Sequence, residues 1–128
     1  MKIAVVVARI LLGLIFFVLG LNGFLLFIPA PPPSGLAGTF FSVMFASHYL
    51  VLVFGVQVIA GAMLLLDRFV PLALVLLAAV LANILAYHVT MMPSGLPIPL
   101  FATLLWFIVA LPLRSHFAPL FAQKAQPY

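Results

Sequence analysis

Four long apolar runs occupy most of this 128-residue sequence and limit the folds that are open to it. A helix needs about 20 residues to cross the hydrocarbon core of a bilayer. We therefore expect four membrane-spanning helices and a short tail, over residues 3–28, 40–66, 69–91, 98–113 and 115–128. Proline and glycine separate the runs. Three consecutive prolines at 31–33, for example, cannot continue a helix.

The composition agrees with a membrane protein. Apolar residues make up 68% of the chain and charged residues 5%, whereas about 25% of the residues in soluble proteins are charged. So few charged side chains cannot cover a water-facing surface, and apolar side chains must face lipid instead. The absence of cysteine excludes disulfides, thiolate metal sites and a thiol nucleophile within this chain. Its single acidic residue excludes chemistry that needs paired carboxylates.

The distribution of basic residues predicts the orientation in the membrane. They lie at the start of the first run, between the second and third, and after the fourth: Lys2, Arg9, Arg68, Arg114 and Lys124. The connections around 28–39 and 92–97 carry no charge. Because short loops rich in Lys and Arg stay in the cytoplasm, we expect both termini there. Short connections favour antiparallel neighbours, so the expected fold is a single-domain, all-α, up-down-up-down four-helix bundle.

The charged residues also indicate partners. They are spread singly and have no interleaved aromatic residues, so anionic membrane lipids are expected as partners and nucleic acid is not. Arg9 lies about two turns into the first helix, and Asp67 should lie at the same cytoplasmic level. We expect a structural ion pair between them. In the alternative, Arg9 extends to the interface and Asp67 is solvated.

Glycines on the first helix predict a close contact between helices. Gly13, Gly20 and Gly23 share one flank of this helix with Arg9, at about 100° per residue. Small residues let two helix backbones approach each other. We interpret this flank as a packing surface rather than a ligand cleft.

Polar side chains within the apolar runs are candidate ligand-binding residues, because a polar group in hydrocarbon needs a partner or a function. They are Asn22, His48, Gln57, Asn83, Tyr87 and His88. Cross-helix hydrogen bonds, including one between Asn22 and Asn83, are the structural alternative. His48 and His88 could bind a quinone carbonyl, or a haem iron or metal. No carboxylate is available to orient them, so we expect no metal site. No set of catalytic residues is expected either, and quinone is the candidate cofactor.

Several segments together resemble the DoxX family. They are the run from Arg9 to Phe24, the run from Val56 to Leu66 with Arg68 and Pro71 after it, and the outer segment from Tyr87 to Pro97. The resemblance covers nearly the full length and rests on the order and spacing of these segments. It implies a small, multi-pass, four-helix protein of the bacterial inner membrane. Some family members are subunits of a thiosulfate:quinone oxidoreductase, and others are linked to redox homeostasis complexes.

One departure from the family pattern guides the expected function. Family members commonly carry an acid where Gln57 stands, and often a basic residue where Phe54 stands. Without this pair the chain lacks the best candidate for handling protons. We therefore expect a non-catalytic accessory subunit that packs against partner subunits of a larger membrane complex. Two alternatives remain open: a quinone-linked redox subunit, and a carrier of small molecules or lipids.

Overall fold

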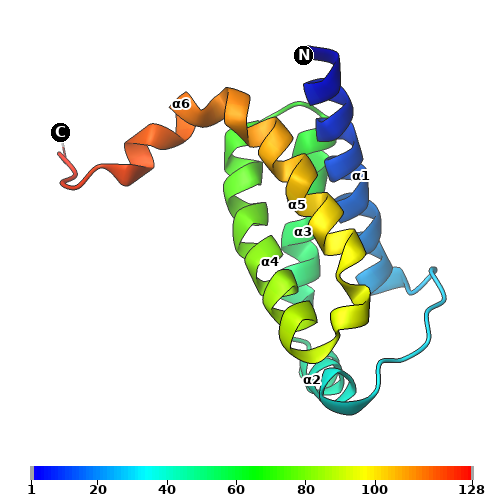
Figure 1. Cartoon of the computed structure of the whole chain (residues 1–128). Helices are drawn as coiled ribbons and strands as arrows, with labels where there is room; N and C mark the ends of the chain where they lie inside the picture. Colours follow the sequence, from blue (N-terminus) through cyan, green and yellow to red (C-terminus); the bar gives the residue numbers. More distant parts are fainter. Residues whose placement is uncertain (1, 128) are drawn as a thin grey trace.

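The protein is described by a computed structural model over residues 2–127, and within this range it is helical, without strands (Figure 1). Four longer helices lie side by side: α1 (Lys2–Leu25), α3 (Leu50–Leu65), α4 (Val70–Met91) and α5 (Pro97–Ala110). Helix α1 makes its most extensive contact with α3 and also packs against α5. Helix α4 packs against both α3 and α5. Each of the four helices thus has two neighbours.

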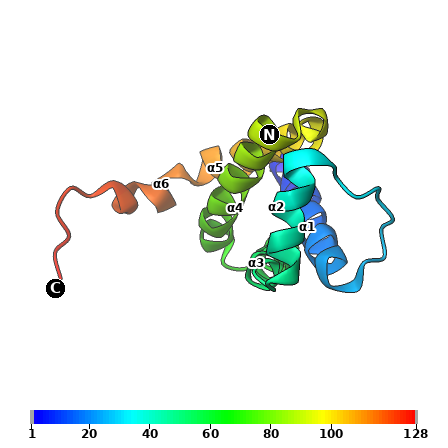
Figure 2. The same ribbon diagram turned by 90° about the horizontal axis from the view of Figure 1, so that it is seen from below.

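Shorter helical segments connect or follow these four. They are α2 (Gly35–Ala46), η1 (Pro93–Gly95), η2 (Leu111–Leu113), α6 (Arg114–Phe117) and η3 (Ala118–Phe121). Helix α2 crosses one end of the group, as the view from below shows (Figure 2), and it contacts α4. At the other end, α6 and η3 lead away from the four helices (Figure 1).

The expected continuous helix over 40–66 is wrong. Helices α2 and α3 meet at 85°, and His48 between them has a φ of +64°. Ser47 Oγ donates to the Met44 carbonyl (3.2 Å) and accepts from the Tyr49 N–H (3.3 Å). A serine that bonds to nearby backbone groups competes with the regular helical pattern. Helix α3 alone has 16 residues, a length of about 24 Å, which is short for a membrane span.

Within residues 2–127, three helical stretches are long and apolar enough to cross a membrane: Lys2–Leu25, Val70–Met91 and Pro97–Phe121. A fourth crossing exists only if the bent pair α2 and α3 counts as one broken span. The last stretch extends past the expected end at 113, so part of the expected tail is helical. The first ends at Leu25, short of the expected 28, because the next residue adopts a left-handed φ of +53°.

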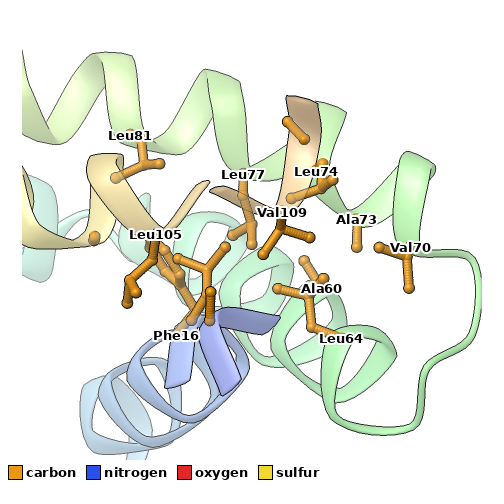
Figure 3. Close-up of a cluster of buried hydrophobic side chains, with 14 of the residues drawn as sticks. Phe16, Ala60, Leu64, Val70, Ala73, Leu74, Leu77, Leu81, Leu105 and Val109 are labelled. Atoms are coloured by element: carbon orange, nitrogen blue, oxygen red, sulfur yellow. The ribbon is translucent and has the colours of Figure 1, made fainter. Parts of the chain in front are cut away.

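The apolar core lies where the four longer helices meet, and side chains from all four converge there (Figure 3). Its largest fully buried side chains are Leu12 of α1, Leu64 of α3, Leu74 and Leu77 of α4, and Val109 of α5. Large apolar side chains also cover the outside of the same helices. An apolar exterior of this kind suits contact with lipid rather than water.

The close glycine contact expected on the first helix is present between α1 and α3. A Cβ atom on Gly61 would lie 2.6 Å from the Phe17 backbone nitrogen and 2.9 Å from the Gly13 carbonyl oxygen. A Cβ atom on Gly20 would lie 3.0 Å from the Phe54 carbonyl oxygen. Real Cβ atoms do not approach backbone this closely. Only glycine therefore permits this separation of the two helices.

Charge gathers at one end of the four helices. The start of α1, the α3–α4 link and the end of α5 lie together, while α2 and η1 lie at the opposite end (Figure 1). The first of these, here called the charged end, carries Lys2, Arg9, Asp67, Arg68 and Arg114. The second, here called the uncharged end, comprises the α1–α2 loop, α2, the α2–α3 break and the α4–α5 connection. None of its residues is Lys, Arg, Asp or Glu.

Candidate functional site

A pocket of about 280 Å³ opens at the charged end, where α1, the start of α4, the end of α5 and α6 meet. Its polar lining consists of Arg9, Asp67 and His116. Its apolar lining consists of Val5, Val6, Val70, Pro71, Val109, Pro112 and Leu113. Charged groups and apolar walls therefore share one opening, a combination that suits an amphiphilic ligand. We call this site the charged-end pocket.

Arg9 connects three segments at this pocket. Its Nε lies 3.6 Å from Asp67 Oδ1, and its Nη1 donates to the Leu64 carbonyl oxygen. The Arg9 side chain is only 15% exposed, whereas that of Asp67 is 69% exposed. The expected ion pair is thus present, with its acidic partner in water. Carbonyls at a helix C-terminus carry partial negative charge, so the end of α3 is a favourable place for the guanidinium.

The tight α3–α4 link sets the position of Asp67. Asp67 and Phe69 both have left-handed backbone conformations, with φ of +55° and +53°. The Arg68 N–H donates to the Met63 carbonyl at 2.9 Å and closes the end of α3. This turn reverses the chain within a few residues. It leaves the Asp67 carboxylate at the pocket rim.

A smaller pocket of about 100 Å³ lies at the uncharged end, beside the break between α2 and α3. Its lining is mostly apolar and aromatic: Gly23, Phe24, Phe45, His48, Leu50, Val51 and Phe54. The rings of Phe24 and Phe54 meet edge to face, with centroids 6.2 Å apart. Of the six candidate ligand-binding residues, only His48 lines this pocket. We call it the aromatic pocket.

The alternative of a hydrogen bond between Asn22 and Asn83 is not realised. Asn22 Oδ1 accepts the Ile28 backbone N–H at 2.7 Å and so closes the end of α1. Asn83 is exposed, and its Nδ2 donates to the Ala79 carbonyl of its own helix at 2.9 Å. Sequence placed both residues at a similar depth but did not fix the direction of their side chains. Each amide is satisfied locally.

Tyr87 and His88 lie together at the uncharged end of α4. Their ring centroids are 4.9 Å apart, and Tyr87 also contacts the ring of Phe40 on α2 at 5.5 Å. The Tyr87 hydroxyl donates to the Met92 sulfur at 3.8 Å. His88 Nδ1 lies 2.8 Å from the Ile84 carbonyl oxygen of its own helix, in hydrogen-bonding distance. Tyr87 thus packs α4 against α2, and neither residue lines the aromatic pocket.

Gln57 is buried where α1 and α3 cross. It is 6% exposed, and its Cβ lies 3.0 Å from the position that a Cβ on Gly20 would take. A cross-helix hydrogen bond was expected for its amide. Within residues 2–127 the amide makes no hydrogen bond to another residue. The six candidates are therefore spread over the α1–α3 crossing, the α4 surface and the uncharged end. In the same range no three His, Asp or Glu residues form a metal-binding group.

Two side-chain arrangements in the structure were not predicted from the sequence. His116 joins Arg9 and Asp67 at the charged-end pocket, and its place just after Arg114 was the available signal. Trp106 donates its indole N–H to the Leu74 carbonyl at 2.8 Å and so links α5 to α4. No pattern in the sequence specified that contact.

Comparison with known proteins identifies no relative. No protein-family model matches the chain, no curated protein matches it, and no solved structure matches it. The residues and their geometry therefore carry the functional interpretation.

Proposed function

We propose that this chain is a DoxX-like, multi-pass protein of the bacterial inner membrane and a non-catalytic accessory subunit of a larger membrane complex. One observation carries this proposal. Polar side chains on α4 and α5 bond to carbonyls of their own helices: Asn83 to Ala79, His88 to Ile84, Thr90 to Ala86, and Thr103 to Pro99. Side-chain donors that bond within their own helix need no ligand to satisfy them, which supports a structural role for these residues.

The proposal includes a topology. We place the charged end in the cytoplasm, following the positive-inside rule. Helices α2 and α3 then form one broken span, and the four spans make an up-down-up-down bundle. Reporter fusions in the α1–α2 loop near Ser34 and after the C-terminal tail test this arrangement. The two reporters are expected in opposite compartments, and the same compartment for both would contradict the topology.

Helix α2 offers a surface for a partner subunit. It carries no charge and exposes several large apolar side chains: Leu36, Phe40, Phe41, Val43 and Phe45. Leu36, Phe40 and Val43 are three or four residues apart and so share one face of α2, which gives a partner an uncharged apolar surface. Helix α2 crosses the ends of the other helices at the uncharged end (Figure 2).

Crosslinking and mass spectrometry test the accessory role. Native mass spectrometry of the gently solubilised assembly is expected to show the chain in a complex of fixed stoichiometry. A photo-crosslinking residue at Val43 is expected to capture a protein of that complex. The matched position Leu104, an exposed apolar residue on α5, is expected to capture lipid. A chain that stays alone in mild detergent, with lipid adducts at both positions, would contradict the proposal.

The aromatic pocket favours a second candidate function, that of a quinone-linked redox subunit. Three phenylalanine rings and the His48 imidazole line it, and a quinone ring can stack on aromatic faces while a carbonyl accepts a hydrogen bond. Solvent extraction of the purified protein is the test. Under this alternative His48→Ala loses bound quinone and His88→Ala keeps it. The accessory role alone predicts no bound quinone in either protein.

A further inference from the structure

We propose that the charged-end pocket binds the phosphate group of an anionic phospholipid, with Arg9 and His116 as its polar contacts. The inference rests on the proposed membrane location but not on the accessory role. Three separate stretches of the chain, within 5–9, 67–71 and 109–116, build the pocket, and they bring apolar and polar groups to one opening. A lipid presents the same combination, because its glycerol and acyl region is apolar and its phosphate is charged.

The electrostatics of Arg9 favour an anion at this site. Asp67 neutralises it only weakly, because the 3.6 Å separation exceeds normal hydrogen-bond length and the carboxylate is largely in water. Arg9 itself is mostly buried and has little water around it. Its guanidinium has five N–H donors, of which the Leu64 carbonyl uses one. The remaining donors can form the paired hydrogen bonds that arginine makes to phosphate.

The surroundings select an anionic lipid over a zwitterionic one. Lys2, Arg68 and Arg114 lie at the same end as the pocket, and Asp67 is the only acid in the chain. Each basic residue near a membrane surface strengthens the attraction to anionic lipid about fivefold. His116 at the pocket lining adds a ring nitrogen that can donate a hydrogen bond to a phosphate oxygen. A free phosphate ion could use the same donors but would leave the apolar walls uncovered.

Native mass spectrometry of the purified full-length chain in neutral detergent tests the proposal. The probes are phosphatidylglycerol, phosphatidylcholine with the same acyl chains, and inorganic phosphate. Phosphatidylglycerol is expected to bind at least about fivefold more tightly than phosphatidylcholine, and excess inorganic phosphate should not displace it. Equal binding of the two lipids would overturn the proposal. Displacement by inorganic phosphate would also overturn it, because the site would then belong to a free anion.

Four variants separate a defined site from diffuse attraction. Arg9→Gln is expected to weaken phosphatidylglycerol binding about fivefold, whereas Lys124→Gln, with the same charge change in the tail, should leave it unchanged. His116→Ala changes an exposed residue whose loss does not endanger folding, and it should also weaken binding. Val6→Trp fills the pocket mouth at an exposed position without changing charge and should weaken binding too.

Two outcomes with these variants would overturn the site. One is an equal loss of binding in Arg9→Gln and Lys124→Gln, and the other is unchanged binding in both His116→Ala and Val6→Trp. These measurements use the isolated chain and need no partner. If the chain has no partners in native membranes, the accessory role fails. The lipid-binding result does not depend on that outcome, so the two failures can be told apart.

Discussion

Towards the charged end, Arg9 and Trp106 bridge different helices, whereas Asn22 and His88 towards the uncharged end bond within their own segments. Arg9 of α1 reaches the end of α3 through Leu64 and Asp67. Towards the same end, Trp106 of α5 donates to a carbonyl of α4. At the uncharged end, Asn22 bonds to the loop that follows its helix, and His88 bonds to its own helix. The charged end is thus held by polar contacts across helices, and the uncharged end by apolar packing.

The contrast in hydrogen bonding indicates which end fixes the helices relative to one another. A directional hydrogen bond between helices sets their register, while apolar contacts allow several similar arrangements. The backbone changes direction sharply at His48, on the side where Asn22 and His88 bond within their own segments. We therefore expect the contacts at the charged end to determine the register of the four longer helices. The apolar packing at the uncharged end leaves room for the bend between α2 and α3.

The largest expected effect comes from the α1–α3 crossing on the side of the charged end. Gly61→Ala places a methyl group against the backbone of Phe17 and Gly13, which cannot move aside, and should destabilise the fold by about 2 kcal/mol. Unfolding in mixed detergent micelles measures this change. Gly55→Ala is the matched control, because its Cβ meets open space, and it should stabilise by about 0.5 kcal/mol.

A glycine-to-alanine substitution near the uncharged end of the α1–α3 crossing tests whether this end is less rigid. Gly23→Ala meets only the side chain of Phe54, which can move to another χ1 rotamer, and not a backbone atom. It should therefore destabilise clearly less than Gly61→Ala. Equal losses of stability in the two variants would mean that both ends of the crossing are equally rigid, contrary to the difference proposed here.

Arg9→Gln should have the next largest effect on stability, a loss of about 1.5 kcal/mol, because it removes a charged hydrogen bond between α1 and α3. Asp67→Asn should cost less than about 0.5 kcal/mol, because its carboxylate is 69% exposed. Both are measured by unfolding in mixed micelles. If the two substitutions cost the same, the ion pair and not the Leu64 contact connects the helices.

Asn22→Ala tests the local bonding at the uncharged end. It removes the acceptor for the Ile28 N–H and should cost about 1 kcal/mol. Because the bond lies within one segment, hydrogen exchange should quicken in residues 26–34 and stay unchanged in α3 and α4. Faster exchange across α4 would show that Asn22 bridges helices after all.

The smallest expected effect is that of Asn83→Ala. Asn83 is exposed and bonds only to its own helix, and alanine has the higher helix propensity. The substitution should be neutral or stabilise by about 0.5 kcal/mol in the same unfolding measurement. A clear loss of stability would restore Asn83 as a cross-helix contact.

Patterns that depend on neighbours along the chain were predictable from sequence. The apolar runs gave the existence of helices near α1, α4 and α5. The flank with Gly13 and Gly20 indicated a close contact between helices. The Arg9–Asp67 pair followed because a lone acid and a buried base at one level have few other partners. Hydropathy alone did not reveal the break at His48, since α2 and α3 are both apolar.

For the candidate sites, too, the sequence indicated residue types but not which residues come together. Residue type marked Asn22, Asn83 and Gln57 as needing partners, but their partners depend on side-chain direction, which the packing of whole helices sets. The two pockets exist only where separate segments converge, so no single run of sequence contains them.

An apolar, helical chain with charge at a few positions follows directly from the order of the residues, because this order fixes hydropathy and charge spacing. The pocket shared by Arg9, Asp67 and His116, and the turn of α2 across the helix ends, arise only in the folded chain. The physical reason is that helix packing, a property of surfaces brought together from distant residues, selects each side chain's neighbours.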